Sequence, residues 1–192
     1  MVDLVKFAGR FLREPSRVGA IAPSSGALGR VITSWARLEE ADAVVEYGPG
    51  TGAFTPYILE RLRPGATFFA LEVDRALYEA FRRRFPEVPV YRDSVAKVAT
   101  YLDAHGIASA DCIISGLPWA SFSAAYQAEL MRSTVDVLAS GGRFATFAYV
   151  HALAMSSAHA FRRLLNRRFS DVGMSPVVWW NLPPAFVYQC VK

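Results

Sequence analysis

From residue 41 onward, short apolar runs alternate with segments of helical pattern, and this alternation constrains the fold more than any other feature. The expected strands are residues 43–47, 67–73, 88–92, 110–116 and 142–150. The expected helices are residues 54–62, 75–85, 94–104, 124–138 and 156–168. Strands that alternate with helices form a mostly parallel sheet that helices cover on both faces. The sequence therefore predicts an α/β fold.

Two β-rich segments, residues 169–178 and 185–191, end the sequence without a helical pattern between them. Asn181, Leu182, Pro183 and Pro184 stand in the connection. The segments are therefore expected to form an antiparallel hairpin at the sheet edge, which brings the sheet to seven strands. Ligands of such sheets bind beyond the carboxyl ends of the strands, at the point where the strand order reverses.

The length of 192 residues fits a single domain over residues 1–192, because no repeat or linker divides it. Cys112 and Cys190 lie in separate apolar runs, as is typical of reduced core thiols. The three histidines lack metal-site spacing, so no metal is expected. Residues 144–161 are uncharged but too polar for a convincing membrane span, and a strand followed by a helix explains them better.

The N-terminal part, residues 1–37, is expected to form amphipathic and lid helices in front of an α/β core over residues 41–192. Residues 4–12 place apolar side chains on one side of a helix and basic ones on the other. Ser24 or Ser25 can cap a second helix that runs to about residue 35. The net charge is +4, so the first helix could lie on an anionic membrane, or it could pack on its own sheet.

A glycine-rich loop follows the first expected strand and opens a helix. Gly48, Gly50, Thr51 and Gly52 form it, and glycines let a ligand approach the backbone closely. Its spacing also satisfies the dinucleotide-binding pattern, which requires an acidic residue such as Glu72 about 20 residues on. Glycine spacing alone therefore leaves NAD and S-adenosylmethionine (SAM) open.

Two further carboxylates and the hairpin favour SAM. Glu46 can attract the ammonium of a methionine moiety, whereas it would repel a pyrophosphate. Asp93 follows the third strand and can accept a hydrogen bond from an adenine amino group, while Glu72 can accept the ribose hydroxyls of either ligand. Each carboxylate alone could be an ordinary helix N-terminal charge, but three at strand ends are harder to explain in that way. The residues expected to bind SAM, or S-adenosylhomocysteine after transfer, are Glu46, Gly48, Gly50, Thr51, Gly52, Glu72, Val73, Asp93, Ser94, Ser115, Gly116 and Leu117.

The turn after the fourth strand, residues 115–119, can hold an acceptor amine with a backbone carbonyl and a flanking ring, or it is a Gly-Pro turn that caps a buried strand. Tyr149 and His151 end the fifth strand and can take a proton from the amine, or they are packing residues. Trp179 and Trp180 could line a substrate passage or belong to the core. The expected catalytic residues are Trp119, Tyr149 and His151.

Four motifs in matching order resemble the bacterial phospholipid N-methyltransferases. They are VGAIAPSS, VEYGPGTGAFT, FALEVD and SGLPW. That family is similar in turn to the ribosomal RNA adenine dimethyltransferases. The RNA enzymes carry Asn-Leu-Pro-Phe/Tyr at the fourth strand and usually a further helical domain. Gly116 replaces that asparagine here, and no such domain is expected, so the resemblance favours the lipid enzymes.

The resemblance implies a class I SAM-dependent methyltransferase fold and a phospholipid substrate. Phosphatidylethanolamine would be methylated stepwise, through its mono- and dimethyl forms, towards phosphatidylcholine. It also implies a protein that associates peripherally with the membrane. We expect a cytoplasmic monomer at the inner face of the cell membrane, where the N-terminal basic helix would contact anionic lipid, and we expect no nucleic acid partner. Methyl transfer to RNA adenine or to a small molecule on the same scaffold is the alternative, and a binding protein without turnover is a third possibility.

Overall fold

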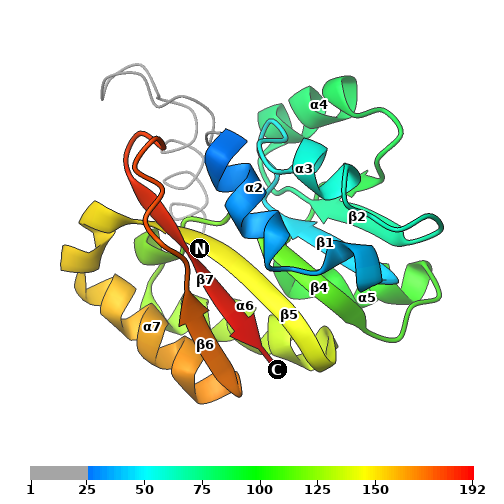
Figure 1. The fold of residues 1–192 in the computed structure, drawn as a ribbon. Coiled ribbons are helices and arrows are strands. Elements are labelled where there is room, and N and C mark those ends of the chain that lie inside the picture. Colours follow the sequence, from blue (N-terminus) through cyan, green and yellow to red (C-terminus); the bar gives the residue numbers. More distant parts are fainter. Residues whose placement is uncertain (1–25) are drawn as a thin grey trace.

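The computed structural model describes residues 26–192, which form a seven-stranded sheet with helices on both faces (Figure 1). The strand order is β3-β2-β1-β4-β5-β7-β6. The strands are β1 (Ala43–Tyr47), β2 (Thr67–Leu71), β3 (Val90–Tyr91), β4 (Ala110–Ser115), β5 (Leu138–Tyr149), β6 (Asp171–Met174) and β7 (Ala185–Val191). Strands β1 to β5 pair in parallel, and β7 pairs antiparallel with both β5 and β6. The predicted parallel sheet and closing hairpin are thus confirmed.

Six α-helices and four short 3-10 helices precede or connect these strands within residues 26–192. The α-helices are α2 (Gly26–Ser34), α3 (Thr55–Leu59), α4 (Arg75–Arg84), α5 (Val98–Ala104), α6 (Ala124–Val137) and α7 (Ser156–Arg168). The 3-10 helices are η1 (Leu38–Glu40), η2 (Val95–Lys97), η3 (Trp119–Ser121) and η4 (Val150–Ala154). The helix expected over residues 4–12 and the cap expected at Ser24 or Ser25 lie outside the described residues.

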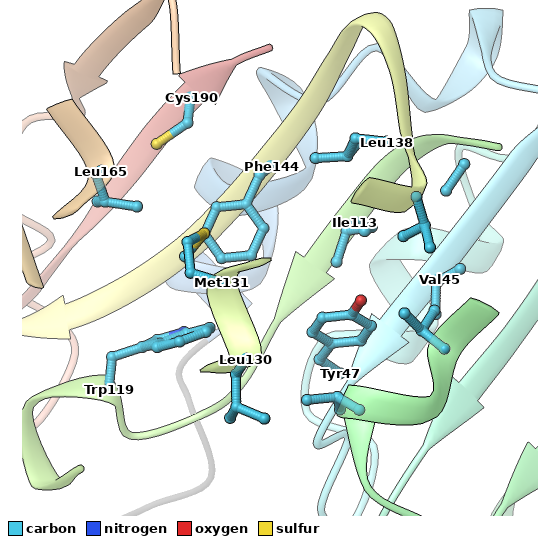
Figure 2. Close-up of a cluster of buried hydrophobic side chains, with 14 of the residues drawn as sticks. Val45, Tyr47, Ile113, Trp119, Leu130, Met131, Leu138, Phe144, Leu165 and Cys190 are labelled. Atoms are coloured by element: carbon cyan, nitrogen blue, oxygen red, sulfur yellow. The ribbon is translucent and has the colours of Figure 1, made fainter. Parts of the chain in front are cut away.

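Two apolar clusters cover the two faces of the sheet. Successive strand residues point to opposite faces, so Val45 and Tyr47 of β1 join the cluster under α5, α6 and α7, whereas Val44 joins the one under α2, α3 and α4. Figure 2 shows the first cluster, in which Phe144 of β5 lies near Met131 of α6. All five residues of β1 are buried, as expected for a central parallel strand.

The element boundaries differ from the prediction where local chemistry intervenes. Strand β3 contains only two residues, because Pro89 has no N–H for the ladder and contributes only its carbonyl, to the Ala70 N–H at 2.9 Å. Helix α3 ends at Leu59, and the turn tightens as Arg61 N–H donates to the Ile58 carbonyl. The helix expected from Ser94 begins as η2 before it continues as α5.

Helix α6 passes directly into β5, which begins four residues before the predicted strand. Leu138 already pairs with Ala110, and the register then shifts before Cys112 pairs with Arg143. Gly141 has a φ of 74° within this irregularity. Such a bulge bends and twists the strand, and sequence periodicity does not reveal it.

Cys112 and Cys190 are free and buried, which confirms the prediction of core thiols. Within residues 26–192, no group of three His, Cys, Asp or Glu side chains could hold a metal ion. No helix in the same range is long and apolar enough to cross a membrane.

Candidate active site

The glycine loop lies at the carboxyl end of β1, between β2 and β4, which is where the strand order reverses. A Cβ atom at Gly48 would lie 2.7 Å from Leu117, and one at Gly52 would collide with the Phe85 ring. Gly50 has a φ of 60°, and a Cβ atom there would meet no other atom within 4 Å. The outer glycines therefore pack against the protein, while Gly50 faces open space in which a ligand can approach the backbone.

Glu46 is fully buried on β1 beneath this loop. Its Oε2 accepts a hydrogen bond from Thr55 Oγ1 at 2.7 Å, and its Oε1 has no hydrogen-bond partner among the described residues. Burial raises the pKa of Glu46 to about 8, the Thr55 hydrogen bond opposes the rise, and the charge of Glu72 adds to it. A buried carboxyl group with an unused oxygen fits a cationic ligand group, such as the ammonium of SAM.

Glu72 follows β2 and ties the loop to that strand. Its Oε2 accepts from Gly50 N–H at 3.1 Å, and its Oε1 accepts from Asp74 N–H at 2.9 Å. Burial raises the pKa of Glu72, and these backbone hydrogen bonds oppose the rise. Each carboxylate oxygen can accept more than one hydrogen bond, so ribose hydroxyls could bind without displacing the loop. Val73 stands next to it and is half exposed.

Asp93 follows β3, and three donors fix its carboxylate. They are Ser94 N–H at 2.8 Å, Lys97 Nζ at 3.1 Å and Tyr101 OH at 2.9 Å. Partial burial alone would raise the pKa of Asp93, but these hydrogen bonds together lower it, so the group remains an ionised acceptor. The Ser94 hydroxyl accepts from Ala96 N–H and caps η2.

The turn after β4 packs directly on the glycine loop. Gly116 N–H donates to the Tyr47 carbonyl at 2.7 Å, and a Cβ atom at Gly116 would lie 2.6 Å from the Gly48 carbonyl oxygen. The Ser115 hydroxyl accepts from Leu117 N–H at 3.3 Å and from Trp119 Nε1 at 3.1 Å. The structure thus brings the predicted residues of this turn together with the glycine loop. Only glycine fits at residue 116 in this arrangement.

An apolar cavity of about 220 Å³ lies beside this turn. The three predicted catalytic residues line it, and none of its described lining residues is lysine or arginine. The lining comes from the β4 turn, the end of β5, the middle of β7, η4 and α7. It comprises Pro118, Trp119, Ala120, Ser121, Phe147, Ala148, Tyr149, His151, Ala152, Leu153, Met155, Ala158, Phe161 and Tyr188. Such a lining suits an apolar substrate group.

The three predicted catalytic side chains differ in what they offer to a substrate. Trp119 is 2% exposed, and its ring stacks on Phe161 with centroids 4.7 Å apart, so it can form part of the wall while its N–H remains engaged by Ser115. Tyr149 and His151 stack with centroids 5.4 Å apart. Burial raises the pKa of Tyr149, so its phenol stays protonated at neutral pH.

Several residues of the site have no clear signal in the sequence. Thr55, which holds Glu46, lies nine residues after it, at the start of α3. Gln127 of α6 is buried, and its side-chain amide donates to the carbonyls of Trp119, Phe122 and Ser157. This amide fixes η3 against α7, and only the tertiary structure shows it.

Alanine substitution of Glu72 and of Asp93 is expected to weaken SAM binding to different extents. Glu72→Ala should lower the affinity about 30-fold or more, because it removes a ligand acceptor and the anchor of Gly50 together. Asp93→Ala should lower it about 10-fold, the effect of one charged hydrogen bond. Calorimetric titration measures both, and far-UV circular dichroism should show the fold retained.

Asp103→Ala removes an exposed carboxylate from α5 and serves as the control. Unchanged affinity in both site variants would show that the strand-end carboxylates do not contact SAM.

Comparison with known proteins places this site in context. No protein-family model matches the chain. The ornithine lipid N-methyltransferase of Singulisphaera acidiphila is 33% identical over 195 residues, which cover 99% of this chain and 96% of that protein. The ribosomal RNA small subunit methyltransferase A of Chlorobium phaeobacteroides is 42% identical over 69 residues, or 36% of this chain and 25% of that protein.

Among solved structures, the O-methyltransferase TomG of Streptomyces achromogenes, in complex with SAM, matches with a TM-score of 0.72 at 18% identity. The match covers 99% of this chain and 90% of that one. The predicted class I SAM-dependent methyltransferase fold is therefore confirmed. The nearly full-length methyltransferase relative also bears out SAM as the cofactor, and the open glycine position and the buried carboxylates fit it.

Proposed function

The chain belongs to the family of the ornithine lipid N-methyltransferase, and from this premise we propose that it methylates the primary amine of a membrane lipid. Phosphatidylethanolamine is the acceptor that the sequence motifs favour, with its mono- and dimethyl forms as further acceptors on the way to phosphatidylcholine. The observation that carries the proposal is the apolar cavity beside the β4 turn and the glycine loop. Its lining suits part of a lipid better than a nucleotide with its phosphates.

Ornithine lipid is the second candidate acceptor, because the relative that matches nearly the whole chain is named for it. Both lipids carry a primary amine on a headgroup that is joined to apolar chains, so an apolar cavity beside the site suits either. A soluble amine would gain little from the apolar lining. The same proposal includes action as a monomer at the inner face of the cell membrane.

In the proposed reaction, SAM would supply the methyl group from its positively charged sulfur. The unprotonated amine nitrogen would form a bond to the methyl carbon as the bond from that carbon to sulfur breaks, which releases S-adenosylhomocysteine. The chain's own contribution is to orient the two reactants and to remove a proton. Tyr149 keeps its proton because burial raises its pKa, so it can donate a hydrogen bond but is a poor base. His151 is exposed beside it at the cavity. We therefore assign proton acceptance to the imidazole of His151.

The decisive experiment incubates the purified protein with labelled SAM and separate vesicles of phosphatidylethanolamine or ornithine lipid. Methylated headgroups resolved by chromatography identify the acceptor. Label in ribosomal RNA and in neither lipid would overturn the proposal in favour of RNA methylation. Loss of lipid methylation in His151→Gln, with SAM affinity retained, would agree with the assigned proton transfer.

Narrowing the cavity is expected to separate lipid methylation from SAM binding. Ala158 of α7 lines the cavity and is buried, so the larger side chain of Ala158→Leu should reduce lipid methylation about 10-fold or more. SAM affinity should stay unchanged, since the glycine loop is untouched. Steady-state rates on vesicles and calorimetric titration with SAM measure the two effects.

Ala160→Leu is the matched control, because residue 160 lies on the same helix and does not line the cavity. Equal losses of lipid methylation in both variants would point to a general disturbance of α7. Full activity of Ala158→Leu would mean that the acceptor does not enter this cavity.

A further inference from the structure

The connection between β6 and β7 exposes an unusual amount of aromatic surface. Trp179 is 68% exposed, Trp180 is 89% exposed and Leu182 is 64% exposed. The interpretation of the two tryptophans as core residues is therefore wrong, and neither lines the cavity. Large apolar side chains in contact with water cost free energy, and a group of them marks an interaction site.

Hydrogen bonds fix the two ends of this connection, whereas Trp179, Trp180 and Leu182 between them are exposed. Val178 N–H donates to the Ala185 carbonyl at 2.7 Å, and Val150 N–H donates to the Pro184 carbonyl at 2.9 Å. Asn181 is buried, and its side chain donates to the Pro183 carbonyl at 2.7 Å. These bonds hold the loop at the carboxyl end of β5, and Figure 1 shows the connection reaching past the sheet there.

Trp179, Trp180 and Leu182 lie in a connection that adjoins part of the cavity lining. Tyr149, which lines the cavity, pairs with Ala185, where the connection ends. Leu153 of η4 and Met155, which stands between η4 and α7, line the cavity and are themselves exposed. Apolar surface therefore extends along this end of the sheet, both on the loop and at the cavity.

Helix α7, which helps to line the cavity, carries two exposed arginines in its middle, Arg162 and Arg163, and no acidic residue. Arg167 and Arg168 lie at the far end of the helix, next to β6. None of the ion pairs found within residues 26–192 involves this helix. Tyr188 lines the cavity; burial raises its pKa, and the charge of Arg162 partly offsets the rise. A lipid bilayer with anionic headgroups complements this combination.

We propose that the loop carrying Trp179, Trp180 and Leu182 inserts into the interfacial layer of a lipid bilayer and holds the cavity mouth against the membrane. Tryptophan suits this position, because its ring is apolar while its N–H can bond to headgroups or water. Arg162 and Arg163 of α7 then lie near anionic headgroups. This inference rests on the proposed function, which explains why the loop would contact a membrane. A lipid amine could then reach the site without leaving the bilayer.

The test compares the wild type with Trp179→Ser/Trp180→Ser in co-sedimentation with mixed vesicles of phosphatidylethanolamine and phosphatidylglycerol. Loss of two interfacial rings should weaken vesicle binding about 10-fold or more. The wild-type tryptophan emission should shift to shorter wavelength on binding and be quenched by lipids brominated on the acyl chains. The double variant retains Trp35 and Trp119 and should lose most of that shift.

Two further variants sharpen the test. Leu59→Ser removes an exposed apolar side chain from α3 and should bind vesicles as the wild type does. Arg162→Gln/Arg163→Gln should weaken binding to vesicles that contain phosphatidylglycerol and reduce its salt dependence, with little effect on vesicles without anionic lipid.

Methylation of dihexanoyl-phosphatidylethanolamine, dissolved as monomers, separates the membrane contact from catalysis. The tryptophan double variant should methylate this soluble lipid at the wild-type rate and lose activity only on vesicles. Wild-type vesicle binding by the double variant would overturn the membrane contact and leave the proposed function standing. Loop-dependent vesicle binding by a protein that methylates no lipid would retain the contact and refute the function. A wild-type dimer that the double variant converts to monomer would show instead that the loop binds a second copy.

Discussion

Replacing Gly50 with leucine is expected to abolish SAM binding while the fold persists. A Cβ atom at this residue would meet no protein atom within 4 Å, so the new side chain would occupy the space in which the ligand approaches the loop. The backbone φ of 60° adds strain of roughly 1–2 kcal/mol for a residue other than glycine. Calorimetric titration should show affinity lowered more than about 100-fold, because steric exclusion removes several contacts together.

Gly106→Leu is the matched control for backbone strain. Gly106 has a φ of 70°, and a Cβ atom there would also meet nothing within 4 Å, but it follows α5 at the other end of the sheet. Both variants should lose similar amounts of thermal stability, whereas only Gly50→Leu should lose SAM binding. Retained affinity in Gly50→Leu would show that SAM does not lie over this glycine.

The fold could be predicted from sequence because its elements carry strong local signals. Continuous apolar runs such as β1 and β4 are typical of buried parallel strands, and the helices between them have clear starts. Asp74, for example, caps α4 by accepting from Ala76 N–H at 2.8 Å and Leu77 N–H at 3.0 Å. The errors fall at boundaries, where a proline, a bulge or a tightened turn decides which residues pair.

The placement of the candidate site residues could be predicted only at or just beyond the carboxyl end of a strand. Glu46, Glu72 and Asp93 lie at the same edge of the sheet as the glycine loop, because the carboxyl ends of parallel strands meet there. The cavity joins residues from five separate segments, and no pattern along the chain reveals such a junction. The exposure of Trp179 and Trp180 could not be predicted either, because the sequence does not indicate whether a tryptophan ring faces the core or water.

Gly116 is a local departure from the motif of the RNA enzymes. The resemblance noted above places an asparagine at this position in the RNA enzymes. Here a Cβ atom would lie 2.6 Å from the Gly48 carbonyl oxygen, so an asparagine would require the β4 turn and the glycine loop to move apart. The two segments are packed more closely than an asparagine permits, and this departure from the RNA enzymes is built into the backbone of the site.

Glu46→Gln is expected to change both the stability of the free protein and its affinity for SAM. Burial raises the pKa of the Glu46 carboxyl group from its ordinary 4.5 to about 8. Between those two values the folded protein keeps a proton that the unfolded chain releases. Stability of the free protein should therefore fall as the pH rises from about 5 to about 8, by up to about 1.4 kcal/mol per pH unit. Above pH 8 both states are ionised, so this contribution then stays constant.

Glutamine cannot ionise, and its amide oxygen can still accept the Thr55 hydrogen bond. Thermal melts of Glu46→Gln without SAM should therefore lose this fall between pH 5 and 8, so the variant should be more stable than the wild type at pH 8. Glu60→Gln, an exposed site at the end of α3, should retain the wild-type pH dependence. A wild-type protein whose stability does not change between pH 5 and 8 would contradict the raised pKa.

The same carboxyl group should link SAM binding to proton release. An ammonium beside Glu46 favours its ionised form, so binding near pH 7 should expel a proton, which calorimetry detects by comparing buffers with different ionisation enthalpies. Glu46→Gln should lose that release, and its affinity should fall at least about 30-fold, the lower range for removing one partner of a buried charge pair. Proton release that persists in Glu46→Gln would assign it to another group, whereas its loss together with the affinity would identify Glu46 as the partner of the ammonium.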